Sequence, residues 1–250
     1  MKILKITIVF LALVSLQITA AQWVESKTTR VVVGGVPVAA PGGALTQVAS
    51  ATNASGEDIY SLATGSRTLA ADNNSCLVCV IGAYSYNSST VSSVKWGSGE
   101  SYEQSFTKLN AAGTDHRAEI WYLVNWPTTL TGTITAEFGD EYDAMMSCTE
   151  WTGVNQTTPL ENFNSATGIN TNAPSITITS ETGAKVVDII VGSSATLTVG
   201  ADQTQQMNLL TGSERAASSI QDGAASVAMS WASSDTDRYF AIAGASINPN

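Results

Sequence analysis

Short segments rich in Val, Thr and Ile alternate with clusters of Gly, Asn, Asp, Ser and Pro along most of the chain. Beyond the first 21 residues, no segment keeps a helical period of apolar positions over several turns. Many short strands at regular spacing are typical of an all-β fold, and we predict one large antiparallel β-sandwich, of jelly-roll or immunoglobulin-like topology. The predicted strands are residues 30–33, 44–50, 59–63, 76–84, 91–96, 105–109, 117–124, 132–138, 144–151, 175–180, 185–191, 205–210, 225–231 and 238–247.

The beginning of the chain has the pattern of a secretory signal. Lys2 and Lys5 precede an apolar run over residues 6–16, and small residues end the segment at Ala20 and Ala21. The apolar run is shorter than the roughly 20 residues that a membrane-spanning helix needs. We therefore predict that residues 1–21 are a cleaved signal peptide and that the protein is secreted, extracellular or on the cell surface.

The next segment, residues 22–43, differs in composition from the rest. Val31, Val32 and Val33 form a short apolar stretch, and a Gly- and Pro-rich tether follows them. One interpretation is that this stretch is the first strand of the sandwich; the other is an assembly strand that completes a neighbour's sheet. The sandwich domain itself is predicted to span residues 44–250.

The net charge of the chain restricts the classes of partner that it can bind. Charged residues make up only 13% of the chain, and the formal net charge is −10. Because phosphates attract basic surfaces, this balance argues against nucleic acid or an anionic membrane as partner. No second long apolar segment follows the first, so we predict no membrane span. The partners that remain are other copies of the chain, in a homopolymer, or surface glycans.

Three cysteines allow one disulfide and one free thiol. Cys76 and Cys79 lie in one predicted strand, where residues three apart point to opposite faces, so they are not expected to pair with each other. Cys148 can pair with either of them, and three reduced thiols are the alternative.

Three sequence segments carry a resemblance. They are Asn-Ser-Cys-Leu-Val-Cys-Val-Ile-Gly-Ala-Tyr-Ser at 74–85, Gly-Thr-Asp-His-Arg-Ala-Glu-Ile-Trp-Tyr-Leu-Val at 113–124 and Trp-Thr-Gly-Val-Asn-Gln-Thr-Thr-Pro at 151–159. With the chain's ending, they resemble an uncharacterised family of bacterial, viral and environmental extracellular jelly-roll domains. The resemblance covers about residues 44–249. It implies a sandwich fold and a surface, adhesive or fibre-like role, and it supplies no catalytic residues.

Candidate catalytic chemistry is sparse. His116 is the only histidine, Asp115 beside it would point elsewhere in an extended segment, and no nucleophile elbow is present. We therefore predict no enzymatic activity. Arg117 and Glu119 share one face of a predicted strand, which favours a structural ion pair or loop clamp; ligand binding is the alternative.

An acidic segment offers a weak calcium candidate. Asp140, Glu141 and Asp143 are expected in a loop, and Ca²⁺ prefers several loop oxygens. A solvated acidic loop without metal is the alternative. No other metal or cofactor is predicted.

Tryptophans are the other candidate binding groups. Trp121 and Trp231 lie in strong predicted strands and are expected in the core. Trp96, Trp126 and Trp151 lie at strand ends or turns and, with Tyr102, form a candidate sugar-binding platform. The alternative is that these rings pack as caps on the core.

These patterns favour a secreted, non-enzymatic structural or adhesive protein, a fibre subunit assembled by strand addition being one form of it. The alternative is a carbohydrate-binding module or lectin that uses loop aromatics. A hydrolase is the most distant candidate.

Overall fold

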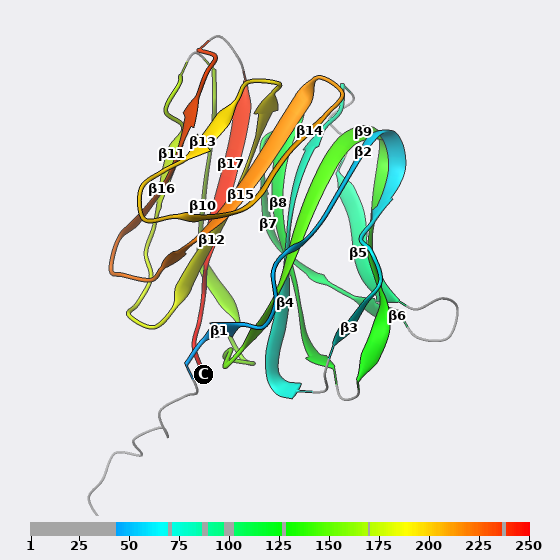
Figure 1. Cartoon of the computed structure of the whole chain (residues 1–250), viewed down its shortest axis with the longest axis vertical. Helices are drawn as coiled ribbons and strands as arrows, with labels where there is room; N and C mark the ends of the chain where they lie inside the picture. The colour runs from blue at the N-terminus through cyan, green and yellow to red at the C-terminus, as the bar shows by residue number, and fades with distance from the viewer. Residues whose placement is uncertain are drawn as a thin grey trace, which may run out of the picture. The chain divides into compact units, whose positions relative to one another are not determined.

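The computed structural model describes residues 44–69, 72–86, 90–97, 103–126, 129–169, 171–236 and 239–250. These residues form an all-β fold of antiparallel sheets that contains no helix, which confirms the predicted fold class (Figure 1). Gly42–Asn250 form one compact unit. Within it we distinguish a first half, which ends with β9, and a second half, which begins with β10.

The first half contains nine strands. They are β1 (Thr46–Gln47), β2 (Thr52–Ala63), β3 (Arg67–Leu69), β4 (Asp72–Tyr84), β5 (Val91–Gly97), β6 (Glu103–Ser105), β7 (Thr107–Ala112), β8 (His116–Trp126) and β9 (Leu130–Thr152). Their hydrogen-bonded order is β6-β5-β9-β4-β8-β7, and β1, β2 and β3 also pair with β9.

β9 is a 23-residue strand that belongs to two layers. Its first part pairs with β5, where Phe138 lies opposite Val91, and its second part pairs with β4. β2 follows the other edge of β9, and its register shifts beside Ile59, a bulge that lets the ribbon bend. The two layers enclose one core, to which the two parts of β9 contribute Ile134 and Met146.

The second half contains eight strands in two sheets. They are β10 (Leu160–Gly168), β11 (Ser175–Ile178), β12 (Lys185–Ser193), β13 (Leu197–Val199), β14 (Thr204–Thr211), β15 (Glu214–Asp222), β16 (Val227–Ser233) and β17 (Phe240–Ile247). One sheet has the order β10-β17-β12-β15-β14, and the other has the order β11-β16-β13. Ile190 and Trp231 lie in the core between these two sheets.

A third core lies between the halves. It contains Val80 and Ile120 from β4 and β8, and Ile189 and Ala243 from β12 and β17. The sandwich therefore has four β-layers and three apolar cores, rather than the two layers of a simple jelly roll. β4, β8, β12 and β17 are buried on both faces over most of their length, which explains the long apolar runs in their sequences.

The interface between the halves requires small residues. A Cβ placed on Gly82 of β4 would lie 2.6 Å from the Cβ of Ala216 in β15 and 3.1 Å from that of Val191 in β12. The middle of β15 is a run of small residues, Ala216 to Ser219, all of them buried. Small side chains let the two central sheets approach closely here.

No helix in the described part of the chain is both long enough and apolar enough to cross a membrane.

Candidate functional site

An open groove lies where strand ends and turns of both halves meet. Its volume is about 650 Å³, within the range of ligand-binding clefts. The first half contributes Tyr84 and Tyr86 at the end of β4 and the turn at 113–116. The second half contributes residues 167–169 at the end of β10 and Tyr239 just before β17.

Four rings form a continuous row along this groove, which we call the aromatic row: Tyr86, Tyr84, His116 and Tyr239. The ring centroids of Tyr86 and Tyr84 are 5.0 Å apart, those of Tyr84 and His116 4.8 Å, and those of His116 and Tyr239 6.4 Å. His116 and Tyr239 are nearly parallel, with an interplanar angle of 17°. Tyr86 is 87% exposed and Tyr239 is 62% exposed, so the two ends of the row face solvent.

The turn that carries His116 depends on a glycine. Gly113 has φ +81°, and a Cβ there would lie 2.0 Å from the carbonyl oxygen of His116. Only glycine fits this conformation without strain. Arg117 Nη1 donates to the carbonyl oxygen of Gly113 at 3.2 Å, which fixes the turn from the strand side.

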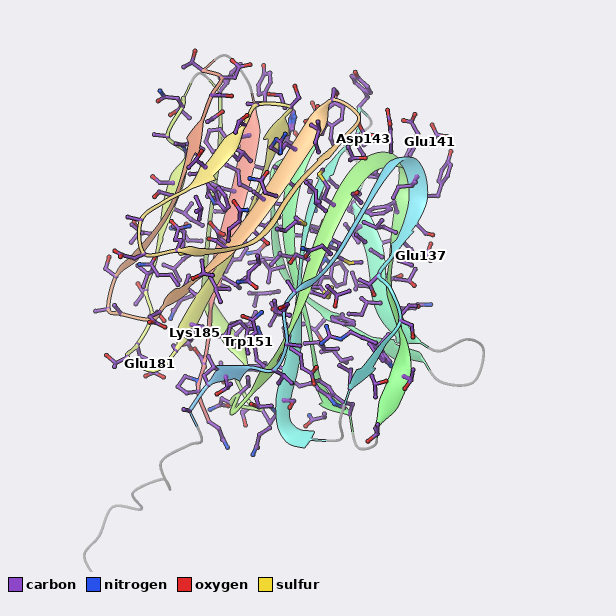
Figure 2. The ribbon with its side chains drawn as sticks, viewed as in Figure 1. Glu137, Glu141, Asp143, Trp151, Glu181 and Lys185 are labelled. Atoms are coloured by element: carbon purple, nitrogen blue, oxygen red, sulfur yellow. A yellow bond between two sulfur atoms is a disulfide. The ribbon has the colours of Figure 1, made fainter. Side chains whose placement is uncertain are left out.

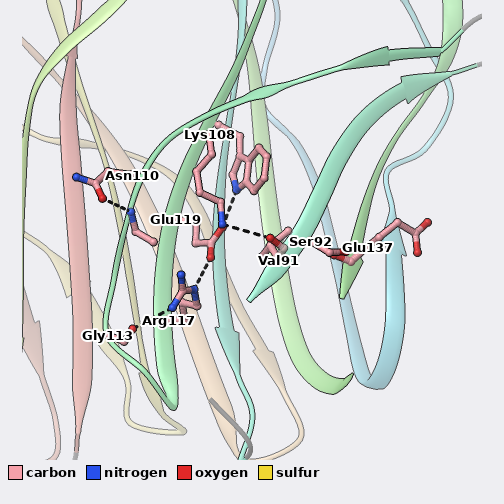
Figure 3. A network of polar contacts seen from close by, with 10 residues as sticks. Val91, Ser92, Lys108, Asn110, Gly113, Arg117, Glu119 and Glu137 are labelled. Carbon is pink, nitrogen blue, oxygen red and sulfur yellow. Dashed lines mark hydrogen bonds and ion pairs between the residues drawn. The ribbon is translucent and has the colours of Figure 1, made fainter. Parts of the chain in front are cut away.

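Arg117 is held in turn by Glu119, whose carboxylate is fully buried. Arg117 Nε donates to Glu119 Oε1, Lys108 Nζ lies 3.0 Å from Glu119 Oε2, and Trp121 Nε1 donates to the same oxygen at 2.8 Å (Figure 3). Lys108 also donates to the carbonyl of Val91 in β5, so the network joins both layers of the first half. Arg117 and Glu119 therefore form the ion pair and loop clamp that the sequence favours, and neither residue lines the groove. Ligand binding by Arg117 and Glu119 stays a prediction.

His116 connects the two halves across the groove. Its Nε2 lies 2.9 Å from Oε2 of Glu214, the first residue of β15. Ser213 Oγ donates to the other carboxylate oxygen of Glu214 at 3.2 Å. The pair fixes the ring orientation of His116, and with it the centre of the aromatic row.

A smaller acidic depression, of about 160 Å³, continues from the groove. Tyr84 and Tyr86 line both, and the depression is otherwise lined by Ser85 and by the carboxylates Asp58, Asp140, Glu141 and Asp143. Figure 2 shows Glu141 and Asp143 beside the bend of β9. The prediction that Asp140, Glu141 and Asp143 lie in a loop is wrong, because β9 continues through them and β2 pairs along the bend.

The calcium candidates do not converge. Among the residues that the structure describes, no group of three or more His, Cys, Asp or Glu side chains is arranged to hold a metal ion. Asp143 Oδ1 instead accepts from the backbone N–H of Asp58 at 3.2 Å, and Asp140 Oδ1 accepts from the N–H of Glu141 at 2.9 Å.

The tryptophan platform predicted from the sequence is wrong. Trp96, Trp126 and Trp151 are buried, each with at most 1% of its surface exposed. Trp151 Nε1 donates to Thr149, and Trp96 packs in the core of the first half. Aromatic rings at strand ends serve here as core caps, the alternative that the sequence left open. Trp121 and Trp231 are buried, as expected.

The disulfide joins Cys79 to Cys148, and Cys76 is a buried free thiol. β4 and β9 place Cys79 and Cys148 directly opposite each other. Cys76 faces the core between the halves, whereas Cys79 faces the core of the first half. The opposite orientation expected from their spacing explains which one pairs.

Three predictions lie outside the described residues. They concern the signal peptide at 1–21, the assembly strand Val31, Val32 and Val33, and Tyr102 in the proposed platform. All three stay predictions.

From the sequence, Tyr86 is only a neighbour of the predicted tryptophan platform, and Tyr239 is not predicted as a binding residue. Tyr86 lies in the polar run Tyr-Ser-Tyr-Asn-Ser-Ser, and Tyr239 follows Ser-Asp-Thr-Asp-Arg. A large aromatic residue inside such a polar turn has few apolar neighbours in sequence. This pattern is the sequence signal that the ring is exposed. That the two turns meet in space follows only from the packing of the halves.

No family model matches the chain, and no curated protein matches it. A solved structure described as "Biofilm associated protein - BSP domain" aligns at 8% identity with a TM-score of 0.25, over 88% of this chain and 53% of that one. The chain thus spans about half of that protein's length. A TM-score this low supports no argument about fold or function.

Proposed function

We propose that this protein is a secreted, non-enzymatic adhesive protein of a surface or extracellular matrix, and that it binds glycan chains in the groove. The proposal rests on one observation, the aromatic row with its two solvent-exposed tyrosines. Tyrosine rings present an apolar face and a polar hydroxyl, which suits the C–H faces and hydroxyl groups of sugars. An exposed apolar cluster of this kind usually marks an interaction surface.

The openness of the groove favours a chain over a small enclosed ligand. The groove is lined from four separate segments, and its aromatic rings succeed one another rather than surrounding a central point. A polymer could lie along such a row and contact one ring after another. Carboxylates of the adjoining depression supply acceptors for sugar hydroxyls.

The row is also preorganised for binding. His116 is fixed by Glu214 from the second half, and the turn that carries it is fixed by Arg117 and Gly113. Little conformational freedom then remains to be lost at the centre of the row on binding, which favours affinity.

A glycan array followed by calorimetry tests the proposal. Tyr86→Ala and Tyr239→Ala should each weaken binding about five-fold, since a stacked ring contributes on the order of 1 kcal/mol. Leu210→Ala is the matched control, because Leu210 is 49% exposed but lines neither the groove nor the acidic depression. All three variants should fold, as their side chains are exposed. Undiminished array binding by Tyr86→Ala and Tyr239→Ala, or no glycan binding by the parent protein, would overturn the proposal.

A further inference from the structure

The acidic depression makes one side of the aromatic row strongly negative. Asp58 and Glu141 are exposed, and Asp140 and Asp143 are half-buried. The turn between β14 and β15 of the second half lies against these carboxylates: a Cβ on Gly212 would lie 2.4 Å from Asp143 Oδ2 and 3.2 Å from Glu57 Oε1. Carboxylates from β2 and β9 therefore gather against this turn.

The negative charges contribute to raised pKa values of neighbouring groups. Burial and the charges of Asp58, Glu57 and Glu214 raise the pKa of Asp143, against a hydrogen bond from the Asp58 backbone. The charge of Glu141 is the main cause that raises the pKa of Tyr60. The pKa of Tyr84, within the row itself, is raised by burial and by its hydrogen bond and charge interaction with Tyr86, with smaller contributions from Glu214 and Asp115.

Cations do not offset these charges within the lining. None of the described residues that line the groove or the acidic depression is lysine or arginine. The one basic group there, His116, is paired with Glu214. Asp237 and Arg238, which precede Tyr239 in sequence, lie outside the described residues.

Building on the proposed function, we propose that the preferred ligand is a glycan with free amino groups, a chain of hexosamine units. Its sugar rings stack on Tyr86, Tyr84 and Tyr239, and its ammonium groups face Asp58, Glu141 and Asp143. Charge complementarity selects this class over neutral and acidic glycans. A row of aromatic rings suits a polymer of repeated sugar rings better than a lysine-rich peptide, because a lysine side chain has no ring to stack on them.

Two probes of equal length, one with free amino groups and one with these groups acetylated, test this inference. They are a β-1,4-linked glucosamine oligomer and its fully N-acetylated counterpart of equal length, measured by calorimetry at about pH 6, where amines and carboxylates both carry charge. The amine form should bind about ten-fold more tightly, the size expected from two or three exposed ion pairs. Raising the ionic strength from about 0.02 M to about 0.5 M should remove most of this difference and leave the acetylated form unchanged.

The charge variant Asp58→Asn/Glu141→Gln sharpens the test. Asparagine tolerates the positive φ of 51° at position 58, and both side chains are exposed, so the variant should fold. Binding of the amine form should fall about five-fold and that of the acetylated form should not change. Glu181→Gln is the matched control, an exposed carboxylate far from the bend of β9 in Figure 2, and should behave as the parent.

The outcomes separate the two proposals. Equal affinity for both oligomers would overturn the amine preference and leave the glycan-binding function standing. Binding of neither oligomer, with no other glycan bound on the array, would overturn both. Binding of an oligolysine peptide, with no binding of either sugar oligomer, would also overturn the two proposals and would assign the groove to cationic peptides.

Discussion

The two halves of the molecule each bury a carboxylate beside a tryptophan, but they stabilise it differently. In the first half, Trp121 Nε1 donates to Glu119 at 2.8 Å, and in the second half, Trp231 Nε1 donates to Asp188 at 2.7 Å. Both carboxylates are fully buried. Glu119 also has two cationic partners, Lys108 and Arg117, whereas the other donors to Asp188 are the backbone N–H and hydroxyl of Ser219.

The lack of a cationic partner affects the ionisation of Asp188. Burial raises the pKa of Asp188 to about 7, and the hydrogen bonds from Ser219 and Trp231 only partly oppose this. Neutral donors do not replace the hydration of a buried charge, whereas a nearby cation favours the ionised form. The first half thus relies on paired charges and a disulfide, and the second on apolar packing around a carboxylate that takes up a proton near neutral pH.

The largest effect should come from the disulfide. Cys79→Ala/Cys148→Ala should lower the free energy of unfolding by about 4 kcal/mol, because the bond closes a loop with a sequence separation of 69 residues. Urea unfolding followed by circular dichroism measures this. Cys76→Ala, which removes a buried thiol but no cross-link, is the matched control and should cost about 1 kcal/mol. Equal losses in both variants would show that the cross-link contributes nothing.

The second-largest effect on stability should come from removing the buried carboxylate of the first half. Glu119→Gln should destabilise the protein by about 3 kcal/mol, because Lys108 and Arg117 would keep their charges without a partner. It should also weaken glycan binding, since Arg117 would lose the contact that orients it toward Gly113. Glu181→Gln, at an exposed position, should leave the urea midpoint unchanged. A loss below about 1 kcal/mol would mean that Glu119 is not needed to balance the cations.

In the second half the corresponding effect depends on pH. The folded-state pKa of Asp188 lies above its unfolded value of about 4, so the protein takes up a proton when it folds at a pH between the two values. The contribution of Asp188 to stability is therefore greatest below about pH 4 and falls as the pH rises. From about pH 5 to pH 7, Asp188 should cost the folded state about 2 kcal/mol. Asp188→Asn should remove this slope in urea titrations, whereas Asp222→Asn, an exposed carboxylate on β15, should keep it. An unchanged slope in Asp188→Asn would contradict the assignment.

The sequence predicted the fold class well because alternation is a local signal. Strands such as 117–124 and 185–191 were found within one or two residues at most ends. β10 and β15 were missed because they are rich in Ala, Ser and Asn, small and polar residues that are buried or paired only through the four-layer packing. The same packing decides the site: whether an aromatic ring is exposed, as Tyr86 is, or buried, as Trp126 is, depends on neighbours distant in sequence.

The smallest predicted effect concerns the contact between the halves. Gly82→Ala should cost about 1 kcal/mol, because its Cβ would meet the Cβ of Ala216, which cannot rotate away, while the loss of unfolded-state entropy partly offsets the clash. Gly65→Ala is the matched control: its Cβ would have no neighbour within 4 Å, so it should be neutral or slightly stabilising. Differential scanning calorimetry measures both. We expect both halves to unfold in one transition, since they share a core. If the close contact at Gly82 couples them, the Gly82→Ala transition should also broaden. A lower midpoint with an unchanged width would assign the coupling to the rest of the central core, around Val80 and Ile189.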